Sequence, residues 1–298
     1  MQMRYRAAAT ALLLTATAGL AATGGTAEAT GTHHTSSRAA SRLVVTVKTT
    51  ASGMSLSEAK IRPGNTLFKV APHGKGGTSV QMVRLRAGYS LTQAFSDINA
   101  AFGGDVKAVR RVDKNMVFYG GASIAAKGTA AQYWGVKVDK RGTYYFVNTE
   151  TNALTSLKVK GTTQKRSLPK TDGWLNAATV NNGAGNQFKV GRHDANRGWM
   201  KTTNNAQEPH FFDLGHVKRS TKPSDVSAYL SDPNAPQVPP FQAKDGAQAS
   251  QQIVSPGKTV VWSYHVPQGK YLVTCFWPSK YDGMPHALMG MWKLFHLG

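Results

Sequence analysis

The sequence has one cysteine, Cys275, among 298 residues, so no disulfide can form within the chain. Negative charge is also scarce, since 15 acidic residues stand against 36 lysines and arginines, for a formal net charge of +21. The motifs Gly-x-Ser-x-Gly, His-Glu-x-x-His and the Walker phosphate loop are missing. Their absence removes the usual sequence evidence for a serine hydrolase, a zinc protease or a nucleotide-binding enzyme. No paired acidic motif offers a general acid and base either.

The N-terminus has the pattern of a secretory signal peptide. Arg4 and Arg6 precede an apolar stretch over residues 7–22, and Ala27-Glu28-Ala29 follows as a small-residue cleavage signal. The apolar stretch is short for a membrane span, and no later segment approaches the roughly 20 apolar residues that a spanning helix needs. We therefore expect residues 1–29 to be removed, residues 30–42 to form a flexible tail, and the protein to be secreted without a membrane span.

Positive charge is concentrated in the first half of the chain. Residues 43–166 hold 19 lysines and arginines and 6 acids, whereas residues 171–298 hold 12 and 8. Such a charge attracts anionic polymers by a sequence-independent mechanism. We find no nucleic-acid-reading motif, so no specific nucleic acid is expected. Outside a cell the candidate partners of the N-terminal half are an anionic cell-wall polymer, a membrane surface or an acidic protein, and the alternative is that the charge serves solubility alone.

Short β-branched and aromatic runs bounded by Gly, Pro and Ser predict strands over residues 43–47, 66–70, 131–138 and 143–147. One helix is predicted from Leu91 to about residue 101, with Ser90 as its N-cap and two glycines as its stop. The second half repeats the plan, with a helix over residues 224–230 and a further Gly-x-Tyr strand start.

The repeat predicts two domains and their boundaries. Tyr144 and Tyr271 mark equivalent strands 127 residues apart, a spacing that suits tandem domains. We predict a first domain over residues 43–160 without a metal site, a linker over 161–172 and a second domain over 173–298. Many short strands with Gly/Pro turns predict an all-β fold of two tandem Greek-key β-sandwiches, each with one short helix.

The surroundings of the lone cysteine suggest a metal site in the second domain. Period-two alternation places Tyr271, Val273 and Cys275 on one face of a strand. Candidate ligands then lie upstream at His210 and downstream at His286 and Met291. One thiolate, two imidazoles and a thioether form the ligand set of a type 1 (blue) copper site. The alternative is that Cys275 is a small buried packing residue.

Three phrases resemble the cupredoxin family, and plastocyanins in particular. They are Asn-Asn-Ala-x-x-Pro-His over residues 204–210, Gly-x-Tyr-x-x-x-Cys over residues 269–275, and His286 followed by Gly290 and Met291. The resemblance covers about 120 residues and implies one copper ion held by His210, Cys275, His286 and Met291, and single-electron transfer. It also implies an accessible His286 as the route by which electrons leave.

One departure keeps other functions open. Ten residues separate Cys275 from His286, whereas plastocyanin-type loops are much shorter, so His286 is the least secure ligand. Met284 and Met289 are alternative thioether ligands, and three methionines around a histidine suit Cu(I) storage or delivery with a copper donor or acceptor. A module without metal that binds anionic polymers is the third interpretation. No His-x-His pair is present, so a trinuclear oxidase cluster is not expected. We expect an electron carrier with a redox partner protein rather than an enzyme.

Overall fold

The computed structural model describes residues 42–50, 53–71, 78–124, 131–180, 185–191, 193 and 195–298. The predicted signal peptide and the predicted tail up to residue 41 lie outside the described residues. Within the described part of the chain, no helix is long and apolar enough to cross a membrane.

The described residues form two large mixed sheets. One has eight strands in the order β11-β10-β12-β15-β7-β4-β1-β2, and the other has nine in the order β17-β16-β13-β14-β6-β5-β8-β9-β3. The strands of the first half are β1 (Val44–Thr49), β2 (Met54–Leu56), β3 (Lys60–Ile61), β4 (Gly64–Ala71), β5 (Thr78–Leu85), β6 (Met116–Ile124), β7 (Gln132–Val138), β8 (Gly142–Asn148) and β9 (Leu154–Val159). Those of the second half are β10 (Gly173–Val180), β11 (Gly185–Val190), β12 (Arg197–Asn205), β13 (His210–Val217), β14 (Gln248–Val254), β15 (Thr259–His265), β16 (Gly269–Thr274) and β17 (Trp292–Leu297).

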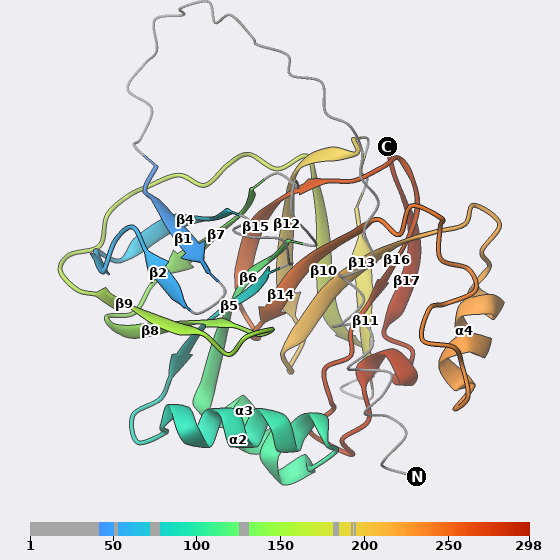
Figure 1. The fold of residues 1–298 in the computed structure, drawn as a ribbon, viewed down its shortest axis with the longest axis horizontal. Helices are drawn as coiled ribbons and strands as arrows, with labels where there is room; N and C mark the ends of the chain where they lie inside the picture. The colour runs from blue at the N-terminus through green and yellow to red at the C-terminus, as the bar shows by residue number, and fades with distance from the viewer. Residues whose placement is uncertain are drawn as a thin grey trace, which may run out of the picture.

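The two halves are built on one plan and share both sheets. The order β2-β1-β4-β7 in the first half corresponds to β11-β10-β12-β15 in the second, and β9-β8-β5-β6 corresponds to β17-β16-β13-β14. The halves meet where β7 pairs with β15, with Trp134 opposite Trp262, and where β6 pairs with β14. Figure 1 shows the two halves side by side, blue to green and yellow to red. The prediction of an all-β protein with two tandem cupredoxin-like sandwiches is confirmed.

The two tyrosines that marked the repeat have the same structural role. The hydroxyl of Tyr144 donates to the carbonyl of Lys140 at 2.9 Å, and that of Tyr271 donates to the carbonyl of Pro267 at 2.8 Å. Both side chains are fully buried, so each hydroxyl needs this partner. The same tyrosine-to-carbonyl hydrogen bond, four residues back along the chain, therefore fixes the start of β8 and of β16.

Among the described residues, the first half has two helices where the sequence predicted one. Helix α2 (Leu91–Phe102) begins at Ser90, whose capping box with Gln93 confirms the predicted start. Helix α3 (Val106–Asn115) was not predicted, and it begins at Asp105, whose side chain accepts two backbone N–H groups. Its valines recur every third residue, a spacing typical of an amphipathic helix, but the basic residues between them had been interpreted only as a charge cluster. The second half has the predicted single helix, α4 (Pro223–Ser231), and a 3₁₀ turn, η3 (His286–Met289).

The core is aromatic in both halves. Trp134 stacks on Phe68 and packs against Phe146, and Trp262 donates its indole N–H to Thr202 at 2.9 Å. Each of these large apolar side chains contributes roughly 1.5–3 kcal/mol when fully buried. The paired tryptophans of β7 and β15 lie where the halves join, so the junction is part of the core.

Candidate metal centre

Three separate segments of the second half deliver His210, Cys275 and His286 to one place. His210 begins β13, where a register shift against β14 lies between residues 210 and 212. Such bulges reorient a side chain and are frequent beside functional sites. Cys275 follows the last residue of β16, and His286 is the first residue of η3. The predicted alternation along β16 is observed, because Tyr271, Val273 and Cys275 lie in the apolar core.

The donor atoms of these three side chains converge. Sγ of Cys275 lies 3.5 Å from Nδ1 of His210 and 3.6 Å from Nδ1 of His286, and the two Nδ1 atoms are 3.1 Å apart. All three residues are at most 1% exposed. Among the described residues this is the one group of His, Cys, Asp and Glu side chains close enough to hold a metal ion.

The spacing fits a shared ion. Metal bonds of about 2.0 Å to imidazole nitrogen and about 2.3 Å to thiolate sulfur, at angles of about 100–120°, place the donors roughly 3.1–3.7 Å apart. All three observed distances fall in that range. Two imidazoles and one thiolate favour a soft or borderline metal such as copper over magnesium or calcium. The donor set therefore suits the predicted copper ion.

Burial controls the protonation of two of the donors when no metal is bound. It raises the pKa of Cys275, mainly because the thiolate is desolvated, and backbone hydrogen bonds oppose this only in part. It also holds the pKa of His210 well below its ordinary value, and the neighbouring His286 adds to the effect. The imidazole of His210 is thus neutral and available as a ligand, whereas the thiol must lose its proton to bind a metal.

A buried carboxylate lies on the far side of His286. Oε2 of Glu208 is 3.3 Å from Nε2 of His286, and the two side chains are 4% and 1% exposed. Burial acts to raise the pKa of Glu208, but His286, the backbone N–H of Lys280 and Asn186 outweigh it and lower the pKa. Glu208 was not predicted as a site residue, because it occupies one of the two unspecified positions of the Asn-Asn-Ala-x-x-Pro-His phrase.

The long loop between Cys275 and His286 folds back as a hairpin. The N–H of His286 donates to the carbonyl of Trp277 at 3.0 Å, and the N–H of Ser279 donates to the carbonyl of Met284 at 2.9 Å. The N–H of Ala287 also donates to the carbonyl of Cys275 at 2.6 Å. The ten intervening residues therefore return His286 to a position directly across from the strand that ends at Cys275.

The first half of the chain holds this hairpin. The indole ring of Trp277 is fully buried and lies edge-on to Phe102 of α2 and Phe118 of β6. Arg110 of α3 donates its Nε–H to the carbonyl of Lys280 at 2.9 Å. In Figure 1, α2 and α3 lie together at one end of the molecule, next to the red loop that precedes η3. The first half thus supports the loop between Cys275 and His286, although none of its described residues belongs to the donor cluster.

The methionines of the loop differ in exposure. Met291 is 1% exposed and belongs to the same core cluster as Cys275, and its backbone N–H donates to the carbonyl of His286 at 2.9 Å. Its role as an axial ligand stays a prediction. Met284 and Met289 are 40% and 41% exposed. The expectation that His286 is solvent-accessible is wrong, because the hairpin and Glu208 cover its ring.

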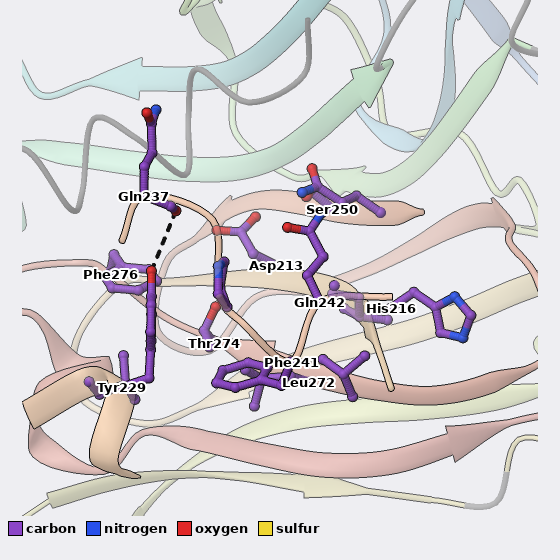
Figure 2. Close-up of a pocket in the computed structure, with 16 residues that line it drawn as sticks. Asp213, His216, Tyr229, Gln237, Phe241, Gln242, Ser250, Leu272, Thr274 and Phe276 are labelled. Atoms are coloured by element: carbon purple, nitrogen blue, oxygen red, sulfur yellow. Dashed lines mark hydrogen bonds between the residues drawn. The ribbon is translucent and has the colours of Figure 1, made fainter. Parts of the chain in front are cut away.

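The opposite face of β16 lines a pocket. Leu272, Thr274 and Phe276 alternate with the core residues and point into a hollow between β13, α4 and the segment that precedes β14. Figure 2 shows Asp213 among these residues. Burial raises the pKa of Asp213 to about 6, although Ser250 opposes the rise. The pocket is separated from the three donors by the strand itself.

The equivalent region of the first half is a hydrogen-bonded turn. Asn148 at the end of β8 donates to Thr78 at 3.1 Å and accepts from the backbone N–H of Glu150 at 3.0 Å. Within the described residues, the first half has no cluster of metal-ligating side chains.

Comparisons with known proteins find structural neighbours only. No protein-family model and no curated protein matches the chain. Auracyanin B is 19% identical over 45% of this chain and 92% of its own, with a TM-score of 0.27. Auracyanin A, a "blue" copper protein from Chloroflexus aurantiacus, is 11% identical over 40% and 100%, with a TM-score of 0.28. The copper nitrite reductase from Nitrosomonas europaea is 11% identical over 87% and 94%, with a TM-score of 0.24. These scores are too low to carry an argument about function, which must come from the donor geometry.

Proposed function

We propose that this protein is an exported copper-binding protein whose site is of the type 1 (blue) class and carries single electrons. The observation that supports the proposal is the convergence of Cys275 Sγ with Nδ1 of His210 and of His286 in a buried position. Met291 is proposed as the weak axial ligand, in keeping with the resemblance. One copper ion in the second half is proposed, and no enzyme activity.

The chain provides a rigid donor frame. When bound, copper supplies a one-electron couple between Cu(I) and Cu(II) beside a thiolate. Strands β13 and β16 pair directly and hold His210 and Cys275, and the hairpin hydrogen bonds hold His286. This strand pairing and these hydrogen bonds hold the three donors in one arrangement, which limits the rearrangement that would accompany gain or loss of an electron. Burial excludes water from the donor triangle.

Copper titration tests the proposal. Cu(II) added to the purified protein should give an intense blue thiolate-to-copper charge-transfer band in visible absorption. The band should reach its maximum at one equivalent of copper. The band should be lost in Cys275→Ser and weakened or shifted in Met291→Leu. A matched control is Met289→Leu, because this thioether is exposed on the same loop. Stoichiometric Cu(II) binding without the band would exclude the blue-copper class.

Copper handling is the second candidate function. Met284 and Met289 expose thioethers beside the site, and thioether ligands favour Cu(I). Transfer of Cu(I) to a chelator should then slow when both are changed to leucine, without any change in the blue band. If the double variant transfers Cu(I) at the wild-type rate, the exposed thioethers have no part in delivery.

The first half is proposed to attach the protein to an anionic cell-wall polymer. Lys60 on β3 pairs with Lys158 on β9, and the side chain of Lys160 lowers the pKa of Lys60 by a direct contact and by charge repulsion. These lysines form no ion pair with an acidic side chain among the described residues, and adjacent unneutralised positive charges suit an anionic ligand. Retention on a polyanion should fall with salt and in a Lys60→Ala, Lys160→Ala variant. If retention changes neither with salt nor in the double variant, the lysines of β3 and β9 do not bind the polyanion.

We further propose that the chain consists of two domains, over residues 43–160 and 173–298.

A further inference from the structure

The two ring nitrogens of His286 lie in different surroundings. Nδ1 faces the donor cluster, 3.1 Å from Nδ1 of His210 and 3.6 Å from Sγ of Cys275. Nε2, on the other side of the ring, lies 3.3 Å from Oε2 of Glu208. The contact is electrostatic and not an aligned hydrogen bond. A neutral imidazole carries one proton, and the negative charge beside Nε2 favours the proton there. The lone pair of Nδ1 is then free for a metal.

Glu208 is itself fixed in position. Its Oε1 accepts the backbone N–H of Lys280 at 2.7 Å, and its Oε2 accepts Nδ2–H of Asn186 at 3.0 Å. Its backbone carbonyl accepts Nδ2–H of Asn204 at 2.7 Å. With the side chain 4% exposed, the carboxylate has little freedom to turn away from His286.

The hydrogen bonds continue into the first half of the chain. Lys280 gives its backbone N–H to Glu208, and its carbonyl accepts Nε–H of Arg110 from α3. Two hydrogen bonds therefore join α3 to Glu208, and the 3.3 Å approach of Oε2 to Nε2 extends the connection to His286. These contacts attach the hairpin to α3 and so restrain His286, which lies at the end of a long loop.

We infer that Glu208 is the positioning residue of this metal centre, which orients His286 through Nε2 and joins it to the first half. The inference rests on the proposed copper site. Carboxylates that accept from a ligating histidine raise ligand basicity, and their loss costs about 10- to 100-fold in metal affinity. A buried negative charge near the ion also favours the higher oxidation state, so Cu(II) affinity depends on Glu208 more than Cu(I) affinity does.

The test compares Glu208→Gln and Glu208→Ala with Gln207→Ala, an exposed side chain in the same phrase. Far-UV circular dichroism and urea unfolding identify variants that fold. In metal-free protein, long-range ¹H–¹⁵N correlation spectra report the tautomer of His286. We expect Nε2–H in the wild type and a shift toward Nδ1–H in Glu208→Ala. In copper-loaded protein, we expect Cu(II) affinity to fall about 10- to 100-fold in both variants. A tenfold fall in the Cu(II)-to-Cu(I) affinity ratio raises the reduction potential by about 59 mV.

The outcomes separate the two proposals. If the wild type gives no blue band but its tautomer still depends on Glu208, the copper site fails and the positioning role stands. If the wild type gives the band and the tautomer, affinity and potential of the folded variants match those of Gln207→Ala, Glu208 has no positioning role. Glu208→Gln keeps the length and an acceptor oxygen, so it preserves the test if Glu208→Ala does not fold.

Discussion

Replacing Asp113 with asparagine should increase the free energy of unfolding more at pH 8 than at pH 4. Asp113 lies on α3 beside the metal loop, and both its carboxylate oxygens are shielded from solvent without a hydrogen-bond partner among the described residues. Burial raises its pKa to about 7, and the charge of Glu208 adds to the rise, while Lys280 and Trp277 oppose it. The folded protein therefore binds this proton more tightly than the unfolded chain.

The sign and size of the effect follow from that shift. The folded pKa, about 7, lies above the ordinary value of 3.8, so the free energy of unfolding falls as pH rises from about 4 to about 7. A shift of about three units at roughly 1.4 kcal/mol each sets an upper limit of about 4 kcal/mol. Water penetration and local relaxation reduce this, and we expect Asp113→Asn to gain about 1–3 kcal/mol at pH 8 relative to its effect at pH 4.

Urea unfolding of metal-free protein at pH 4, 6 and 8, in the presence of a chelator, measures the effect. Any fixed cost of burying the asparagine amide cancels, because the quantity of interest is the difference between pH values. The matched control is Asp282→Asn, since Asp282 is exposed on the same hairpin. A difference between Asp113→Asn and wild type that is the same at all three pH values would refute the reasoning.

Three further predictions concern the core, the repeat and metal uptake. Trp277→Ala should cost about 3–5 kcal/mol in urea unfolding, because it empties the space between the hairpin and α2, and it should also weaken the blue band. Tyr144→Phe and Tyr271→Phe should each cost about 1 kcal/mol in the same assay, since each removes one corner hydrogen bond; a large difference would contradict their equivalence. Because burial raises the pKa of Cys275, metal uptake releases its proton, so apparent affinity in competition titrations should rise about tenfold per pH unit from pH 6 to 8. An affinity independent of pH would mean that the thiol is not a ligand.

Local patterns were enough to predict the fold class and some of its elements. Strands β1, β4, β7, β8 and β16 and helix α2 were recognised because alternation, caps and glycine stops lie close together in sequence, whereas strands such as β5, β6 and β10 were not predicted. Helix α3 was missed, although Asp105 and the valine spacing indicate it, because its charged residues were interpreted only as a basic cluster. The sharing of both sheets could not be predicted, since the pairing of Trp134 with Trp262 joins residues 128 positions apart.

The candidate metal centre likewise has some residues that local patterns predict and others that depend on tertiary packing. His210 and Cys275 were found from short phrases whose spacing suits ligands at the ends of strands. The burial of His286 and the contact with Glu208 depend on how the hairpin packs on the other half, and no local pattern contains that information. Asp113 was missed for the same reason, because its surroundings combine α3 with the hairpin residues Trp277 and Lys280 and with Glu208, which precedes β13.

The long loop explains why the first half belongs to the metal centre. A free loop of ten residues would leave His286 with many positions, and ordering the backbone costs roughly 1–2 kcal/mol per residue. Here the cost is offset by the hairpin hydrogen bonds, the buried Trp277 and the contact of Lys280 with Arg110. Two of these three depend on α2 and α3, so a cupredoxin-like site with a loop of this length needs a neighbour to hold it. The half that contains no cluster of ligands among its described residues therefore supplies the rigidity that its partner half lacks.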